Sequence, residues 1–275
     1  MCAGLKFERD AQMHKETSFI SRILRGAALA LIPISYLSLT YAGWWTPPVG
    51  SALILLLARL AWPKQWTKVV GLNIPRNQIG ISLTVLCVVA IASSGIIAAI
   101  ASSEGIAFTP VWESKTWGLS LFHTVGQTLN EEIVLGALLL GAVKNRLKAI
   151  HPLVISATVA LAFSLLHYAF YGLRPPGLPN AGVLSTAALA SLFAIGVVRN
   201  NCILSTGNVG YAWAIHMGWN AIFMNGTYTW PGSDISLAEP AMFDAILGNG
   251  YMVAISTALM ALSLLLFAKK RAPAS

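Results

Sequence analysis

The chain of 275 residues is 56% hydrophobic and only 10% charged, whereas charged residues make up about a quarter of an average soluble domain. This composition excludes an ordinary soluble domain and indicates a polytopic membrane protein. The formal net charge of +8 would suggest a nucleic-acid partner in a soluble protein, but here the basic residues gather in short stretches between apolar runs. We therefore expect the lipid bilayer as a partner and no nucleic acid.

Apolar runs of the length that a transmembrane helix needs, roughly 20 residues, recur along the chain. They predict an all-α fold with about eight transmembrane helices, over residues 26–45, 48–62, 78–101, 118–143, 152–171, 182–198, 208–226 and 248–267. We find no internal repeat and no linker. We therefore expect one membrane-embedded domain, 26–268, between a cytoplasmic N-terminal segment, 1–25, and a basic cytoplasmic tail, 269–275.

The basic residues predict an orientation. A cytoplasmic N-terminus places most of the 18 Lys and Arg residues on the inner side, Lys144 and Arg199 among them, and leaves only Lys115 and Arg174 outside. Cytoplasmic loops of membrane proteins carry such an excess of positive charge. We therefore expect both termini to be cytoplasmic in an integral, multi-pass protein. In a bacterium it would lie in the plasma (inner) membrane.

Two adjacent glutamates, Glu131 and Glu132, lie midway along the fourth predicted helix. Carboxylates at that depth are costly, so by default they mark a functional site. On a helix they point about 100° apart, so we expect one to face the reaction and the other a supporting group. Polar residues at four-residue spacing form two neighbouring stripes there and predict a cavity: His123, Gln127 and Glu131, and Thr124, Thr128 and Glu132.

Two later helices each carry a histidine. His167 follows Phe163 by one turn in the fifth predicted helix, and His216 shares a face of the seventh with Asn220, four residues on. A single histidine in an apolar helix is often a packing residue. In combination with the glutamate pair, the two histidines form the minimum set for activating a water molecule.

These motifs, in this order, resemble the CPBP family, also called ABI, of glutamic-type intramembrane endopeptidases, which includes the type II CAAX prenyl proteases. The family pattern is two adjacent Glu followed four residues later by Arg, then Phe-xxx-His, then His-xxx-Asn, and the resemblance covers about residues 118–226. One departure matters, because the position of the family Arg is occupied by Gly136. Glu132 is then protonated, held by a hydroxyl such as that of Thr128, or paired with a residue that the sequence does not reveal.

The resemblance implies hydrolysis of a peptide bond of a membrane-associated protein or peptide, which could be lipidated or carry a C-terminal sorting tail. We expect Glu131 to act as general base toward a water that His167 also holds. His216 and Asn220 would stabilise the oxyanion, and Glu132 would support the site. No Ser or Cys nucleophile is needed.

Three alternatives remain open from the sequence. Glu131, His167 and His216 could bind zinc as a metalloprotease site, with a fourth position left for water. Glu131, Glu132 and the histidines could instead form the proton relay of a proton-coupled transporter, although the chain lacks the repeats typical of such folds. The absent Arg also leaves open a non-catalytic membrane binding protein.

Overall fold

A computed structural model describes residues 23, 25–39, 46–110, 117–172, 182–229 and 239–271. The predicted N-terminal segment and the tail lie mostly outside these residues, as do the segments that contain Lys115 and Arg174. Over the described residues the chain is all-α, as predicted, apart from one short two-stranded sheet.

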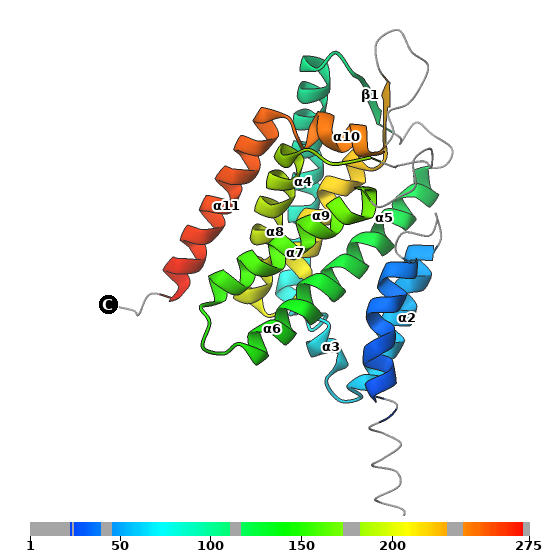
Figure 1. Cartoon of the computed structure of the whole chain (residues 1–275), viewed down its shortest axis with the longest axis vertical. Helices are drawn as coiled ribbons and strands as arrows, with labels where there is room; N and C mark the ends of the chain where they lie inside the picture. Colours follow the sequence, from blue (N-terminus) through cyan, green and yellow to red (C-terminus); the bar gives the residue numbers. More distant parts are fainter. Residues whose placement is uncertain are drawn as a thin grey trace, which may run out of the picture.

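The described elements follow one another along the chain (Figure 1). An apolar helix, Arg25–Leu39, comes first. It is followed by α2 (Thr46–Ala61), α3 (Trp66–Val69), α4 (Arg76–Ser103), β1 (Ala107–Pro110), α5 (Trp117–Glu131), the π-helix η2 (Glu132–Leu139), α6 (Leu140–Arg146), α7 (Pro152–Gly172), α8 (Thr186–Thr206), α9 (Gly210–Phe223), β2 (Gly226–Thr229), α10 (Glu239–Ile246) and α11 (Gly250–Arg271).

Four of the described helices are long and apolar enough to cross a membrane: Arg76–Ser103, Pro152–Phe170, Thr186–Thr206 and Gly250–Lys269. Two shorter apolar helices, Arg25–Leu39 and Thr46–Ala61, accompany them. The chain therefore has the helices of an integral membrane protein. The predicted number of eight transmembrane helices stays a prediction, because α9, at 14 residues, is shorter than a full crossing requires.

The fourth predicted helix, 118–143, is one uninterrupted helical run in the structure. It begins as α5, continues as η2 from Glu132, and ends as α6 at Arg146. Short π-helical segments are rare and frequently lie at functional sites. Here the change of helix type falls between Glu131 and Glu132.

Helix α8 lies near the centre of the molecule, where it packs against α7, α9 and α11 (Figure 1). It extends from Thr186 to Thr206, so the predicted end at residue 198 was wrong. The helix ends at Gly207, whose positive φ of 74° forms the left-handed cap that glycine favours. The correction places two further turns, including Arg199, inside the bundle.

Two glycines let helices approach closely beside the site. A Cβ at Gly126 of α5 would lie 2.4 Å from the backbone nitrogen of Pro48 in α2. A Cβ at Gly218 of α9 would lie 2.7 Å from the carbonyl oxygen of Leu86 in α4. Because both distances are shorter than a Cβ atom permits, a larger residue would push the helices apart. The two glycines therefore fix the positions of α5 and α9.

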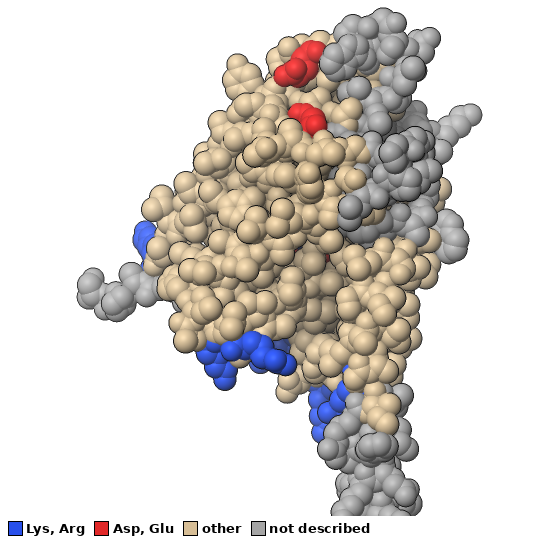
Figure 2. All heavy atoms as spheres, in the orientation of Figure 1, with Lys and Arg blue, Asp and Glu red and all other residues tan. Residues whose placement is uncertain are grey.

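Strands β1 and β2 pair in antiparallel fashion, with Ala107 opposite Thr229 and Pro110 opposite Gly226. This sheet joins the end of α4 to the end of α9, and the sequence did not predict it. Charged side chains are segregated along the long axis of the molecule (Figure 2). Lys and Arg gather at the end where Figure 1 draws α3 and α6, and acidic side chains lie at the opposite end.

Candidate active site

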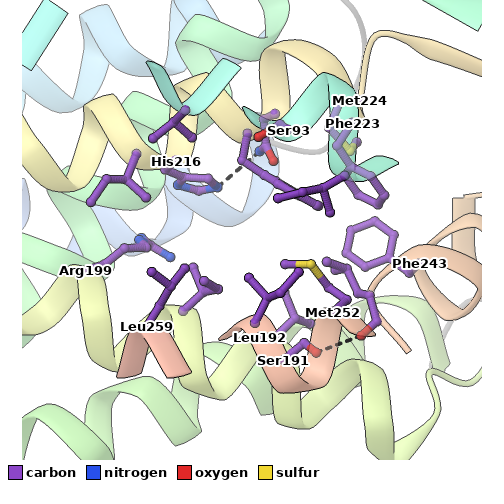
Figure 3. Close-up of a pocket in the computed structure, with 18 of the residues that line it drawn as sticks. Ser93, Ser191, Leu192, Arg199, His216, Phe223, Met224, Phe243, Met252 and Leu259 are labelled. Atoms are coloured by element: carbon purple, nitrogen blue, oxygen red, sulfur yellow. Dashed lines mark hydrogen bonds between the residues drawn. The ribbon is translucent and has the colours of Figure 1, made fainter. Parts of the chain in front are cut away.

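A cavity of about 330 Å³ lies among α4, α5, α7, α8, α9, α10 and α11. Figure 3 shows Arg199 and His216 at one side of this space, and Phe223, Phe243 and Met252 at the other. The ionisable and amide side chains that line it come from four helices: Gln127, Glu131, His167, Arg199, His216 and Asn220. Four of the five predicted site residues, from the three helices α5, α7 and α9, therefore line one cavity: Glu131, His167, His216 and Asn220.

The fifth residue, Glu132, has a different environment from its neighbour. Glu131 lines the cavity, whereas Glu132 is fully buried and is not one of the described residues that line it. Gln127 Nε2 donates to Glu131 Oε1 at 3.4 Å, which confirms that the first polar stripe shares a face. Among the described residues, Glu131 Oε2 has no hydrogen-bond partner, and it lies 3.7 Å from His216 Nε2. The Glu131 carboxylate therefore has an oxygen available to a molecule in the cavity.

Arg199 of α8 is the cationic partner of Glu132. Its Nε forms an ion pair with Glu132 Oε1, and the guanidinium carbon lies 4.3 Å from the ring centroid of Phe163. The Arg199 side chain is buried within α8, whereas the predicted helix 182–198 ended just before it. Stacking on an aromatic face and pairing with a carboxylate offset the cost of burying a guanidinium.

The hydroxyl of Thr128 does not hold Glu132. Thr128 Oγ1 donates to the carbonyl oxygens of Thr124 and Val125, at 2.8 and 3.2 Å. Of the three predicted possibilities for Glu132, pairing with a residue that the sequence did not reveal is the one that the geometry supports.

The space that a side chain at position 136 would need is occupied in the structure. A Cβ at Gly136 would lie 2.7 Å from Ile203 Cδ1 and 3.2 Å from Glu132 Oε2. Ile203 is on α8, one turn after Arg199. Helix α8 thus both fills the space beside Gly136, through Ile203, and provides the guanidinium that pairs with Glu132, through Arg199.

His216 connects the two glutamates. Its Nδ1 lies 2.9 Å from Glu132 Oε1, and since a carboxylate oxygen only accepts, Nδ1 carries the proton of this bond. Its Nε2 lies 3.1 Å from Asn220 Nδ2, which confirms that His216 and Asn220 share one face of α9. Asn225 Nδ2 donates to the Asn220 carbonyl oxygen at 3.1 Å and to Thr124 Oγ1 at 3.0 Å, which ties α9 to α5.

His167 is oriented by its own helix. Its Nδ1 lies 2.9 Å from the carbonyl oxygen of Phe163, so Nδ1 donates and Nε2 can accept. The imidazole packs edge-on against the Phe163 ring at 4.5 Å between centroids. Phe163 therefore positions two side chains: its carbonyl oxygen and ring hold His167 of α7, and the same ring stacks against Arg199 of α8.

The zinc hypothesis finds no matching ligand group. Within the described part of the chain, no three His, Cys, Asp or Glu side chains are grouped so that they could hold a metal ion. Glu131, His167 and His216 all line the cavity, and each histidine has its Nδ1 engaged, by a backbone carbonyl and by Glu132 respectively. Nε2 is therefore the accepting nitrogen of each ring.

A buried carboxylate pair beside two histidines, in a helical membrane protein, is consistent with the active site of a hydrolase. Residues 113–222 match the family model described as Type II CAAX prenyl endopeptidase Rce1-like. Over these residues the chain matches a type II CAAX prenyl endopeptidase domain of the CPBP family, close to the 118–226 over which the motifs predicted the resemblance. No curated protein and no solved structure matched the chain.

Arg199 is the residue that sequence reasoning missed. The apolar run of the sixth predicted helix weakens at Arg199-Asn200-Asn201, which favoured a helix end there. The signal for the longer helix was Gly207, because glycine directly after a run of helix-compatible residues is typical of a helix C-terminus.

Proposed function

We propose that this protein is an intramembrane endopeptidase that hydrolyses a peptide bond of a membrane-associated protein or peptide. One observation carries the proposal: Glu131 faces a buried cavity with His167, His216 and Asn220, while Glu132 is held behind them by Arg199. The family match over residues 113–222 supports the reaction class.

Glu131 acts as the general base. Its Oε2 accepts a proton from a water molecule as the water oxygen attacks the carbonyl carbon of the substrate. His167 Nε2 accepts the second hydrogen bond of that water and so fixes its orientation, because Nδ1 already donates to Phe163. The proton on Glu131 then passes to the amide nitrogen as the C–N bond breaks, which releases an amine and a carboxylic acid.

Asn220 is the direct oxyanion donor. Its Nδ2 carries two N–H groups. One donates to His216 Nε2, and the other is left to donate to the substrate carbonyl oxygen, on which negative charge develops. His216 orients Asn220 in this arrangement, because its unprotonated Nε2 accepts from Asn220 Nδ2 while its Nδ1 donates to Glu132.

The Glu132–Arg199 pair serves as support. It is electrically neutral as a unit, and Glu132 holds the His216 ring through Nδ1. Because the cation compensates Glu132, the negative charge of Glu131 is the one presented to the water. Arg199 and Glu132 are therefore positioning residues.

The apolar side of the cavity indicates the kind of substrate. Phe223, Phe243 and Met252 face the space opposite Arg199 and His216 (Figure 3). Such a surface accepts an apolar side chain, a C-terminal sorting tail or the lipid group of a lipidated protein.

The charge distribution supports an orientation. The basic end drawn in Figure 2 would face the cytoplasm, with both termini on that side, in the plasma membrane of a bacterial cell. Residues 26–268 would form one membrane-embedded domain. Reporter fusions at residue 270 and after Asp234 test this, and a cytoplasmic reporter after Asp234 contradicts it.

The decisive experiment compares membrane proteomes by mass spectrometry from cells that express the wild type or Glu131→Gln. We expect at least one membrane-protein bond cleaved only by the wild type. The matched control is Glu104→Gln, which changes an exposed carboxylate that lines no part of the cavity and should leave cleavage intact. Identical cleavage with wild type and Glu131→Gln would refute the proposal and favour a binding protein.

A further inference from the structure

A second, larger cavity of about 800 Å³ lies at the basic end of the molecule. Its walls come from the helix Arg25–Leu39, the α2–α3 connection, η2, α6 and the end of α8. Among the described residues, none lines both this cavity and the candidate active site. It therefore needs an explanation of its own.

The lining has two chemically distinct parts. The inner walls are apolar, from Leu29, Ile32, Val134, Leu138 and Ile203. The rest carries amphipathic and cationic side chains: Trp62, Gln65, Lys68, Lys144 and Asn145. Both lysines are exposed, and no acidic residue in the described part of the chain lines the cavity. The site thus combines an apolar slot with two uncompensated positive charges.

The position of the lysines indicates the depth of the opening. Lys68 is on α3 and Lys144 is on α6, the two elements at the end where Figure 2 shows basic side chains. Trp62 lies between α2 and α3 on the same wall. Lysine and tryptophan together are typical of the headgroup layer of a bilayer. The apolar walls then lie at the depth of the acyl chains.

We propose that this cavity binds an anionic phospholipid, with its phosphate between Lys68 and Lys144 and an acyl chain against the apolar walls. The volume is within the range of ligand sites, about 300–1,000 Å³. Two lysines without an acidic neighbour favour a lipid with net negative charge over a zwitterionic one, since each contributes roughly a fivefold change in partitioning to an anionic headgroup.

A lipid in this cavity contacts both helices that hold the Glu132–Arg199 pair. Val134 and Leu138 belong to η2, which begins with Glu132, and Ile203 lies one turn after Arg199 on α8. Ile203 also occupies the space at Gly136. A bound lipid would therefore stabilise the packing of η2 on α8, the two elements that carry the pair.

The test uses the full-length protein in a neutral detergent. Lipid retention is measured by native mass spectrometry, and thermal unfolding is followed with phosphatidylglycerol, with phosphatidylcholine of the same acyl chains, and with glycerol phosphate as the headgroup alone. We expect phosphatidylglycerol to be retained and to raise the unfolding temperature, and the other two to do neither. Equal protection by phosphatidylcholine, or protection by glycerol phosphate alone, would overturn the proposal.

Two independent variants locate the site. Lys68→Gln with Lys144→Gln should weaken phosphatidylglycerol binding roughly 25-fold, the product of two fivefold effects. The control pair, Arg76→Gln with Lys148→Gln, removes two exposed cations that do not line the cavity and should bind as the wild type does.

Gly141→Leu tests the slot with both lysines intact. A Cβ at Gly141 meets no atom within 4 Å, so the added side chain has room to enter the cavity without a clash. It should reduce retention, whereas Gly80→Leu, at an equally open position on α4, should not. Unchanged binding in both test variants refutes the site. A photocrosslinker at residue 141 that captures another part of this chain, or a second copy, also refutes it.

Discussion

Helices α4 and α8 are both long and apolar enough to cross a membrane, yet only 17% of the most apolar stretch of α4 is buried inside the protein, against 56% of that of α8. On α4 the exposed side chains include Leu83, Val88 and Ile91. On α8 the buried ones include Ser191, Arg199 and Asn201. Lipid solvates aliphatic side chains well and polar groups badly, so the outer helix presents its apolar residues and the inner helix hides its polar ones.

The polar side chains of α8 find partners on its neighbours. Asn200 Nδ2 donates to the Ser156 carbonyl on α7 at 2.8 Å, and Asn201 Nδ2 donates to Ser263 Oγ on α11 at 3.1 Å. The buried polar side chains of α8 therefore form hydrogen bonds and one ion pair within the protein, whereas most of the exposed side chains of α4 are apolar. The two should respond differently to substitution.

The largest effect should follow loss of the interior cation. Arg199→Gln leaves Glu132 buried without its ion-pair partner, which costs about 3–5 kcal/mol in comparable buried pairs. Unfolding in mixed micelles, followed by helical circular dichroism, measures the change. Arg76→Gln at the start of α4 is the matched control, because that guanidinium is exposed.

Replacing Glu132, the other member of the ion pair, tests the same interaction. The sequence alone made Glu132→Gln a mild change, since no cation was visible one turn away. The structure reverses that expectation, because Glu132→Gln orphans Arg199. The double variant Glu132→Gln with Arg199→Gln should recover part of the loss. A double variant as unstable as the sum of the single variants would show that the pair is not coupled.

Asn220→Ala should lower turnover by roughly 10²–10³, the usual cost of one oxyanion donor, or about 2.7–4 kcal/mol of barrier. Its effect on stability should be small, since the Asn225 contact is to the Asn220 backbone. Cleavage of a peptide substrate identified in the proteomic comparison provides the readout. Asn249→Ala, which removes an amide outside the cavity, serves as control. Normal turnover in Asn220→Ala would remove this residue from the mechanism.

The difference in stability between replacing a buried and an exposed apolar side chain can also be measured on a single helix, α4. Ile97 of α4 is fully buried, whereas Ile91 is 74% exposed. Ile97→Ala should cost about 2–5 kcal/mol, because it leaves a cavity against packed neighbours. Ile91→Ala faces lipid and should cost much less. Similar losses for both variants in bilayer unfolding measurements would mean that Ile91 is covered by protein, as in an oligomer.

The smallest expected effect is that of chelation. A glutamate-activated water needs no metal, so strong chelators should leave cleavage unchanged, with the detergent-solubilised enzyme assayed before and after dialysis. Complete loss that added zinc restores would revive a metal site with Glu131, His167 and His216.

The candidate site residues could be predicted because the sequence itself shows which ionisable residues lie in apolar segments. A carboxylate or imidazole within an apolar run is costly, so Glu131, Glu132, His167 and His216 were conspicuous. The helices of the bundle followed from the same apolar runs. Spatial pairing was not visible in this way, since Arg199 is far from Glu132 in sequence and stood at a predicted helix end.

Other features were missed because their signals are short. The π-helix η2 spans eight residues, over which its hydrophobic pattern does not differ from that of an α-helix. Strands β1 and β2 have four residues each and depend on each other for pairing. Helix α10 falls inside 227–247, which the prolines and aromatic residues favoured as a loop.

The relocation of the guanidinium also constrains how this chain can diverge from its family. A side chain at position 136 would require the Ile203 terminal methyl group to move, and an arginine there, beside Arg199, would place two cations on one carboxylate. Losing Arg199 first would leave Glu132 alone in the bilayer. Positions 136, 199 and 203 are therefore epistatic, and relatives that share this solution should be found by covariation of the three rather than by the local spacing of the motif.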